Sequence, residues 1–212
     1  MMRTKFREPV SGLTHLFAAL AALPGGAYLI LSRKAGFTEE IPLLIYSFSL
    51  VFMLSASAAY HLINMGPNVT RILRKVDHSA IFILIAGTYT PICMNLFGEY
   101  WKWKLLVTVW VIAAAGIVLK IFFIGAPRWI STAVYLAMSW LSVLAGKEIL
   151  SSFPTGAIMW LFIGGFFYTA GAIIYATKKL DLKPGVFGFH EVWHIFVILG
   201  CLSHFILIAL YA

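Results

Sequence analysis

His190 and His194 carry the clearest chemical signal in the sequence, because two imidazoles four residues apart lie on one face of a helix. Their Cβ atoms would be about 5–6 Å apart, close enough for both rings to bind one metal ion. Glu191 lies between them, and the apolar stretch that follows is long enough to cross a bilayer. Ionisable side chains at the mouth of a membrane helix are costly, so we expect a function to account for them.

The composition defines the class of protein that must position these residues. The chain is 61% hydrophobic and 11% charged, with a mean hydropathy of +0.92. A soluble fold has too little interior for so much apolar surface. The net charge is +8, but the basic residues fall in connectors and form no continuous patch. We therefore expect membrane lipids as partners, and no nucleic acid.

We predict an all-α membrane protein, a seven-transmembrane helix bundle that forms a single domain over residues 1–212. A spanning helix needs about 20 mostly apolar residues, and the chain has room for seven. The predicted helices cover about residues 9–32, 41–64, 77–97, 103–124, 129–145, 156–177 and 187–211.

The distribution of lysine and arginine predicts the orientation, because cytoplasmic loops carry an excess of both. Eleven of the sixteen fall on the side of the N-terminal tail and five on the other side, so we predict a cytoplasmic N-terminus and an external C-terminus. The eleven are Arg3, Lys5, Arg7, Arg71, Arg74, Lys75, Lys120, Arg128, Lys178, Lys179 and Lys183; the five are Arg33, Lys34, Lys102, Lys104 and Lys147.

The predicted topology brings further ionisable groups to the depth of His190 and His194. The second helix ends on the cytoplasmic side, close to His61, and the first and third helices begin there, close to His15 and Asp77. Five ionisable groups from four helices therefore converge on one membrane level. Residues scattered without a shared function would have no reason to agree in depth.

His61 is the expected third metal ligand, with Ser57 one turn earlier on the same helix. Three imidazoles leave a fourth position open, as in catalytic zinc sites. A simpler interpretation is that His190 and His194 are interfacial histidines bonded to headgroups or to the backbone, and that His61 is a capping or interface residue at the end of its helix. Asp77 fits a helix N-terminal cap as well as a residue that holds the metal's water, because a helix start favours an acid.

Several other polar residues have weaker signals. Glu8, Ser11 and His15 share one face of the first helix, and we expect them to support the metal ligands. His78 and His204 are expected to be packing or local hydrogen-bond residues.

His190-Glu191-Val-Trp-His194 also matches the H-E-x-x-H motif of zinc metalloproteases, in which the glutamate is the general base. Five residues with three fixed are a weak match, and no further acidic ligand or protease signature follows. We expect Glu191 to face headgroups or a lysine of the connector before the last helix.

Three features together resemble the signature of the hemolysin III family: Ser57 four positions before His61, Asp77 sixteen positions after His61, and His190 four positions before His194. This is the largely bacterial branch of the progestin and adipoQ receptor superfamily, and its pattern is similar to that of the alkaline ceramidases. The resemblance covers nearly the whole chain. It implies zinc held by the three histidines, with Asp77 and Ser57 around the bound water, in a multi-pass protein of the bacterial plasma membrane.

Glu8, Ser11 and His15 resemble the first motif of the superfamily, with serine at the position where asparagine is usual. The family name reflects haemolytic, pore-like activity, whereas the receptor relatives suggest hydrolysis of lipid amides. Two hypotheses therefore stay open. One is a zinc-dependent hydrolase of a lipid amide or ester, such as ceramide, with Asp77 as proton acceptor and Ser57 orienting water or substrate. The other is a non-enzymatic pore, ion pathway or membrane-state sensor with a structural zinc.

Overall fold

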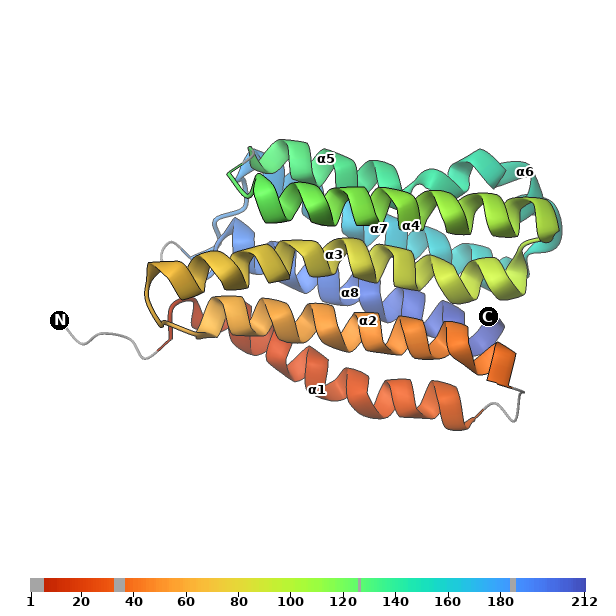
Figure 1. The fold of residues 1–212 in the computed structure, drawn as a ribbon, viewed down its shortest axis with the longest axis horizontal. Helices are drawn as coiled ribbons and strands as arrows, with labels where there is room; N and C mark the ends of the chain where they lie inside the picture. Colours follow the sequence, from red (N-terminus) through yellow and green to blue (C-terminus); the bar gives the residue numbers. More distant parts are fainter. Residues whose placement is uncertain (1–5, 33–36, 126, 184–185) are drawn as a thin grey trace.

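The computed structural model describes residues 6–32, 37–125, 127–183 and 186–212, whose helices lie side by side as a bundle (Figure 1). No β-strand occurs in these residues, which hold one isolated bridge between Lys183 and Phe187. Seven spans within the described residues are long and apolar enough to cross a membrane. The predicted all-α, seven-helix membrane fold is therefore confirmed.

Six of the seven spans are single α-helices, and the fifth is made of three consecutive pieces. The fifth consists of α5 (Arg128–Ser139), the 3-10 helix η1 (Leu141–Ala145) and α6 (Gly146–Ser152). The six single helices are α1 (Pro9–Leu31), α2 (Phe37–Leu62), α3 (Pro67–Leu96), α4 (Glu99–Phe122), α7 (Thr155–Thr177) and α8 (Phe189–Tyr211).

The bundle has two distinct ends, which Figure 1 shows at its left and right. At the N-terminal end α1, α3, α5 and α8 begin, and α2, α4 and α7 end; the opposite one is the C-terminal end. Which end faces the cytoplasm stays a prediction. Four of the basic residues counted for it, Arg3, Lys5, Arg33 and Lys34, lie outside the described residues.

The third helix begins at Pro67, earlier than the predicted start at Asp77. Gly66, with φ of 87°, makes the turn before it, and proline at the first position suits a helix start. Asp77 therefore lies inside α3, and the prediction that it could cap the helix start is wrong. The basic residues that suggested a connector, Arg71, Arg74 and Lys75, belong to the first turns of α3.

The fifth span continues to Ser152, past the predicted end at residue 145, and it is broken near Trp140. The side chain of Tyr89 on α3 bridges the break. Its hydroxyl donates to the carbonyl oxygen of Ser139 and accepts from the backbone N–H of Ser142, each at 2.9 Å. Backbone groups inside a membrane must be satisfied within the protein, and Tyr89 satisfies one on each side of the break.

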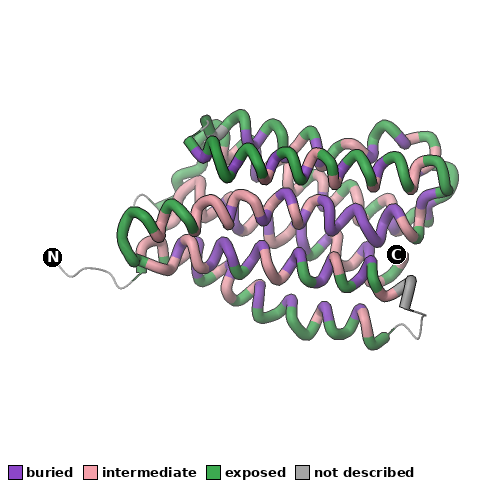
Figure 2. Tube along the Cα trace, in the orientation of Figure 1, coloured by how far each residue is buried: buried purple, intermediate pink, exposed green. Residues whose placement is uncertain are grey.

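α3 lies at the centre of the bundle. In its most apolar stretch 67% of residues are buried, against 28% in α1 (Figure 2). A Cβ at Gly87 of α3 would collide with Ser49 of α2, so only glycine permits this approach of the two helices. The outer helices expose large apolar side chains such as Phe17, Phe48 and Phe166, as expected of surfaces that face lipid.

Candidate metal centre

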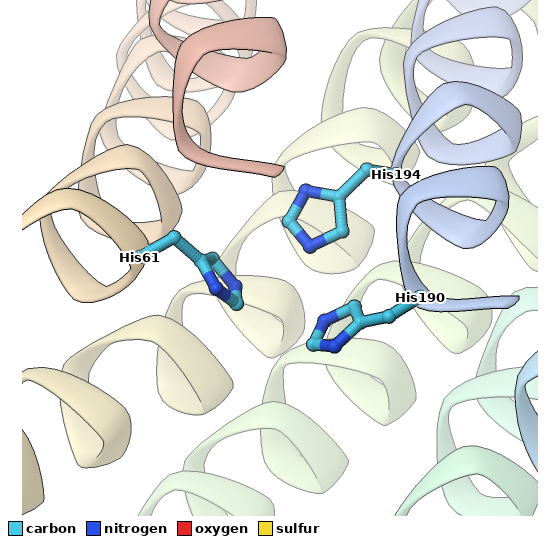
Figure 3. A group of neighbouring side chains, drawn as sticks. All are labelled: His61, His190 and His194. Carbon is cyan, nitrogen blue, oxygen red and sulfur yellow. The ribbon is translucent and has the colours of Figure 1, made fainter. Parts of the chain in front are cut away.

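His61, His190 and His194 come together at the N-terminal end of the bundle (Figure 3). Their ligand nitrogens all lie within 4.8 Å of one another. The ring centroids are separated by 5.0 Å between His61 and His190, 4.7 Å between His61 and His194, and 4.9 Å between His190 and His194. His61 and His194 are buried and His190 is half-buried. The described residues thus contain a three-histidine cluster that could hold a metal ion.

Two local features produce this cluster. His190 and His194 are one turn apart in the first turns of α8, so both rings project from the same face. His61 lies in the last turn of α2, and the backbone N–H of Glu8 donates to its carbonyl oxygen at 2.9 Å. The start of α1 is thereby fastened to the end of α2 beside the rings.

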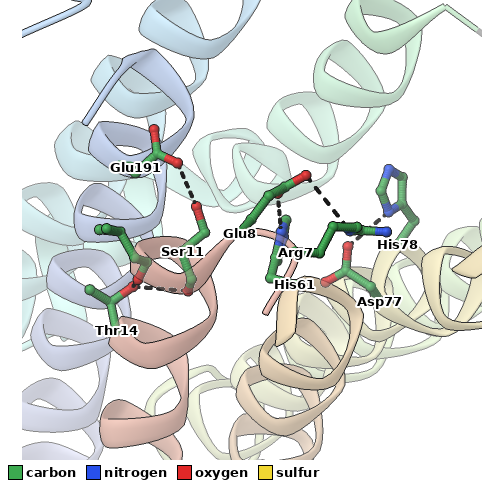
Figure 4. Close-up of polar contacts among 9 residues, drawn as sticks. Arg7, Glu8, Ser11, Thr14, His61, Asp77, His78 and Glu191 are labelled. Carbon is green, nitrogen blue, oxygen red and sulfur yellow. Dashed lines mark hydrogen bonds and ion pairs between the residues drawn. The ribbon is translucent and has the colours of Figure 1, made fainter. Parts of the chain in front are cut away.

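Glu8 also fixes the ring of His61 (Figure 4). The Nδ1 of His61 donates to Oε2 of Glu8 at 2.5 Å, which leaves Nε2 of that ring as the free ligand atom. This hydrogen bond is the main cause that holds the pKa of the Glu8 carboxyl below its usual value, so Glu8 is a carboxylate at neutral pH. A carboxylate behind a histidine in this way orients the ring and raises its basicity toward a metal.

Both carboxylate oxygens of Glu191 accept hydrogen bonds within the protein, which the sequence did not reveal. Its Oε2 accepts from the backbone N–H of Gly188 at 2.8 Å, completing a cap of α8. Its Oε1 accepts from the hydroxyl of Ser11 on α1 at 3.0 Å. The expectation that Glu191 faces headgroups or a lysine was therefore wrong, because both carboxylate oxygens are engaged inside the protein.

His15 packs directly against the cluster, with its ring centroid 4.0 Å from that of His194. It is buried, and neither of its ring nitrogens has a hydrogen-bond partner among the described residues; the same is true of Nδ1 of His194. Buried polar atoms without partners are uncommon and need an explanation. Unpartnered imidazole nitrogens beside a free Nε2 of His61 suit a divalent metal ion that prefers nitrogen ligands.

Asp77 and His78 form a bonded pair beside the cluster. The Nδ1 of His78 donates to Oδ2 of the buried Asp77 at 2.9 Å, and Tyr135 of α5 donates to the carbonyl oxygen of His78 at 2.9 Å. The prediction that His78 is a packing or local hydrogen-bond residue is confirmed, although Asp77 was not expected as its partner. Adjacent residues on a helix diverge, so spacing gives no signal for such a pair.

A cavity of about 280 Å³ connects these groups. His15, Asp77 and the three clustered histidines all line it, so the five ionisable groups expected at one depth are brought together. Glu8, Ser57 and His78 line it as well, whereas Ser11 is not among the lining residues and reaches the site only through Glu191. Its apolar wall is built from Met53, Ile81, Leu84, Ile85, Leu136 and Val197.

His204 lies farther along α8 and also lines the cavity. Its Nε2 is 3.5 Å from the carbonyl oxygen of Leu161, and its ring centroid is 5.5 Å from that of Tyr168. The prediction that His204 is a packing and local hydrogen-bond residue is confirmed. It is a half-buried histidine of the same helix that stands apart from the metal cluster.

The fold and the cluster define a multi-pass membrane protein with a buried histidine site that could hold a metal. Residues 3–205 match the sequence model of the family described as haemolysin-III related, and the chain belongs to that family. More distant similarity to a progestin and adipoQ receptor-like protein and to an adiponectin receptor protein places the family within the progestin and adipoQ receptor superfamily.

Individual relatives agree with this assignment. The chain is 34% identical over 212 residues to a hemolysin-3 homolog of Bacillus subtilis, covering 99% of this chain and 96% of the relative. It is 31% identical to hemolysin-3 of Bacillus cereus, over 96% and 91% of the two chains. It is 26% identical to progestin and adipoQ receptor-like protein 1 of Caenorhabditis elegans, over 80% of this chain and 43% of the relative. Its apolar spans and bacterial relatives identify a multi-pass protein of the bacterial cell membrane.

Proposed function

We propose that this protein is a zinc-dependent hydrolase that cleaves the amide or ester bond of a membrane lipid. The observation that carries the proposal is the position of the three-histidine cluster on the wall of an apolar cavity, with a buried carboxylate, Asp77, on the same wall. Three histidines without a fourth protein ligand are typical of catalytic zinc sites and not of structural ones.

The proposed ligands are His61, His190 and His194. These rings would hold the zinc, which would supply Lewis-acid chemistry by polarising a carbonyl and lowering the pKa of a water to about 7. Glu8 holds His61 by its Nδ1, and His15 packs on His194, so both rings are fixed before a substrate arrives.

Asp77 is the proposed general base. It accepts a proton from the attacking water as the water oxygen forms its bond to the carbonyl carbon of the lipid. As the bond between that carbon and the leaving nitrogen or oxygen breaks, Asp77 returns the proton to the leaving group. His78 holds Asp77 in place through its hydrogen bond, and the hydroxyl of Ser57 orients the water or the substrate.

The cavity favours a lipid over a peptide as substrate. Its walls beyond the histidines are mainly aliphatic and aromatic, with a few polar groups such as Arg74 and Ser131. Apolar pockets with few polar groups bind apolar ligands with a defined orientation. Glu191, which would be the base of an H-E-x-x-H protease, is held by Ser11 and Gly188 and does not line the cavity. We therefore assign the role of general base to Asp77. From the distribution of lysine and arginine, we also propose that the N-terminal end of the bundle faces the cytoplasm.

Release of free fatty acid from ceramide-like lipids by the purified protein tests the proposal. We expect release by the zinc-loaded wild type, loss of release after the metal is removed by a chelator, and recovery when zinc is restored. Asp77→Asn should lose release while it keeps its metal.

Release that survives Asp77→Asn, or that is unaffected by the chelator, would contradict the proposal. A matched assay of dye leakage from lipid vesicles distinguishes the pore hypothesis. Leakage caused equally by wild type and Asp77→Asn, without fatty acid release from either, would favour a non-enzymatic membrane protein with a structural metal.

A further inference from the structure

Lys120 lies beside the cavity, in the last turn of α4, and its side chain has too few partners for a buried charge. The residue is only 6% exposed. Its Nζ donates to the hydroxyl of Ser131 on α5, and Ser131 lines the cavity. An ammonium group carries three N–H donors, and Ser131 is the one acceptor found for it among the described residues. Two donors therefore remain for another group.

A second positively charged residue, Arg74, lies at the same cavity. It is near the start of α3, at the same end of the bundle as Lys120 in the last turn of α4, which packs against α3. Within the described part of the chain, Glu8, Asp77 and Glu99 provide the carboxylates of all the ion pairs, and none of these pairs includes Arg74 or Lys120. Among the described residues, two cations thus flank the cavity without a carboxylate in an ion pair with either of them. Burial of uncompensated charge is costly, so a bound anion is the expected compensation.

Arg7 adds unpaired donors near the same cavity. Its guanidinium packs 4.0 Å from the centre of the Tyr60 ring, and Tyr60 lines the cavity. Nε and Nη2 of Arg7 are buried and have no hydrogen-bond partner among the described residues. Oε1 of Glu8 is 3.7 Å from Nε, too far for a hydrogen bond, and Glu8 is shared with His61 (Figure 4).

We propose that Arg74 and Lys120 form a subsite for a phosphate-type anion at the cavity, with the apolar part of the same molecule lying against the aliphatic wall. The inference rests on the proposed lipid hydrolysis, and it predicts that lipids whose headgroup carries a phosphate bind more tightly than neutral ones such as ceramide. A neutral headgroup would leave both cations uncompensated, so the cavity should discriminate against it.

Binding of two lipids that differ only in the phosphate tests the subsite. Purified full-length protein in detergent is titrated with a short-chain ceramide, with its 1-phosphate ester, and with inorganic phosphate alone. We expect the phosphate ester to bind about 10–100-fold more tightly than the neutral lipid, as hydrogen bonds to charged groups imply. The measurement needs no turnover, so it stands whether or not the protein hydrolyses lipids.

Substitutions of the two cations test whether they cause the preference for the phosphate ester. Lys120→Gln and Arg74→Gln should each reduce it about tenfold, and Lys120→Arg should retain it because the charge is kept. Lys104→Gln is the matched control, since Lys104 lies on the same helix at the C-terminal end and contacts exposed Tyr100. If Lys120→Gln fails to fold, Arg74→Gln alone decides, because Arg74 is only half-buried.

Each outcome has a definite meaning. Weak competition by inorganic phosphate supports a lipid headgroup as the natural anion. Competition as strong as that of the lipid ester also supports the subsite and assigns it to free phosphate. Equal affinity of wild type for both lipids would overturn the inference, as would an equal loss in Lys104→Gln and Lys120→Gln, which would indicate only general surface charge.

Discussion

The polar contacts at the two ends of the bundle differ in the sequence separation of the residues that they join. At the N-terminal end, His61 donates to Glu8 across 53 positions of sequence, and Ser11 donates to Glu191 across 180. Both contacts join side chains from distant parts of the chain. The first involves His61, a proposed metal ligand, and the second involves Glu191 on α8, the helix that carries His190 and His194. Local contacts also occur at this end, from His78 to Asp77 and from Gly188 to Glu191, but the two tertiary contacts join its ionisable groups across the bundle.

At the C-terminal end the contacts are mostly local. Glu99 accepts from Lys102 and Trp103, three and four positions away on the same helix. Two longer contacts occur, from Asn95 to a main-chain oxygen of Ala212 and from the main chain of Gly98 to Glu148, and each involves a backbone group. Contacts of this kind secure helix ends, whereas those at the other end hold side chains in a defined geometry. Matched substitutions at the two ends should therefore differ in effect.

Replacement of a proposed ligand should have the largest effect. His194→Ala should lower metal affinity by more than about 100-fold, because loss of a ligand should exceed the 10–100-fold cost typical of its outer partners. The matched control is His204→Ala on the same helix, which removes a half-buried histidine that lines the same cavity. Metal analysis of the purified proteins is the measurement. Equal metal content in the two variants would break the contrast between cluster and packing residue.

Asp77→Asn should have the next largest effect, on hydrolysis alone. The substitution keeps the shape and the bond to His78 but removes the base, so fatty acid release should fall about 10²–10⁴-fold with metal content unchanged. Glu99→Gln at the C-terminal end is the control and should retain release. A variant that loses its metal together with its activity would instead show that Asp77 supports the ligands.

Glu8→Ala should have an intermediate effect on metal affinity. It removes the carboxylate that orients His61, so we expect a 10–100-fold weaker metal Kd, measured by competition with a chelating dye. Glu99→Ala removes an acid with two side-chain partners at the other end and should leave the Kd unchanged. An unchanged Kd in Glu8→Ala would mean that the ring of His61 is held by packing alone.

Glu191→Gln should have the smallest effect. The amide oxygen can still accept one of the two hydrogen bonds, so metal content and hydrolysis should stay within about twofold and stability should fall by less than about 1 kcal/mol, seen as a slightly lower Tm. Glu148→Gln, which also holds a backbone N–H, is the control at the C-terminal end. Abolished hydrolysis in Glu191→Gln together with an active Asp77→Asn would restore the metalloprotease interpretation.

The sequence was sufficient for the seven spans and for the three-histidine cluster, but for different reasons. Long apolar stretches report spans directly, and the spacing of His190 and His194 reports a shared helix face. His61 followed from topology, since helices of alternating direction bring its end of α2 to the start of α8. The start of α3 was misjudged because Arg71, Arg74 and Lys75 interrupt the apolar pattern, although a helix can continue beyond the membrane core.

Other features leave no mark in the sequence. The break near Trp140 lies inside an apolar stretch, and it depends on Tyr89 of another helix to satisfy the backbone. The contacts that fix the candidate site, from His61 to Glu8 and from Ser11 to Glu191, depend on how α1 packs against α2 and α8. Spacing along one helix cannot predict a contact between two.

Zinc K-edge X-ray absorption of the purified, zinc-loaded wild type tests the metal centre most directly. We expect three imidazole nitrogens at about 2.0–2.1 Å and one further light atom, with no sulfur in the coordination sphere. The signal of at least one imidazole should be lost in His194→Ala and retained in His204→Ala. Fewer than three imidazoles in the wild type, or a spectrum that His194→Ala leaves unchanged, would contradict a metal site formed by His61, His190 and His194.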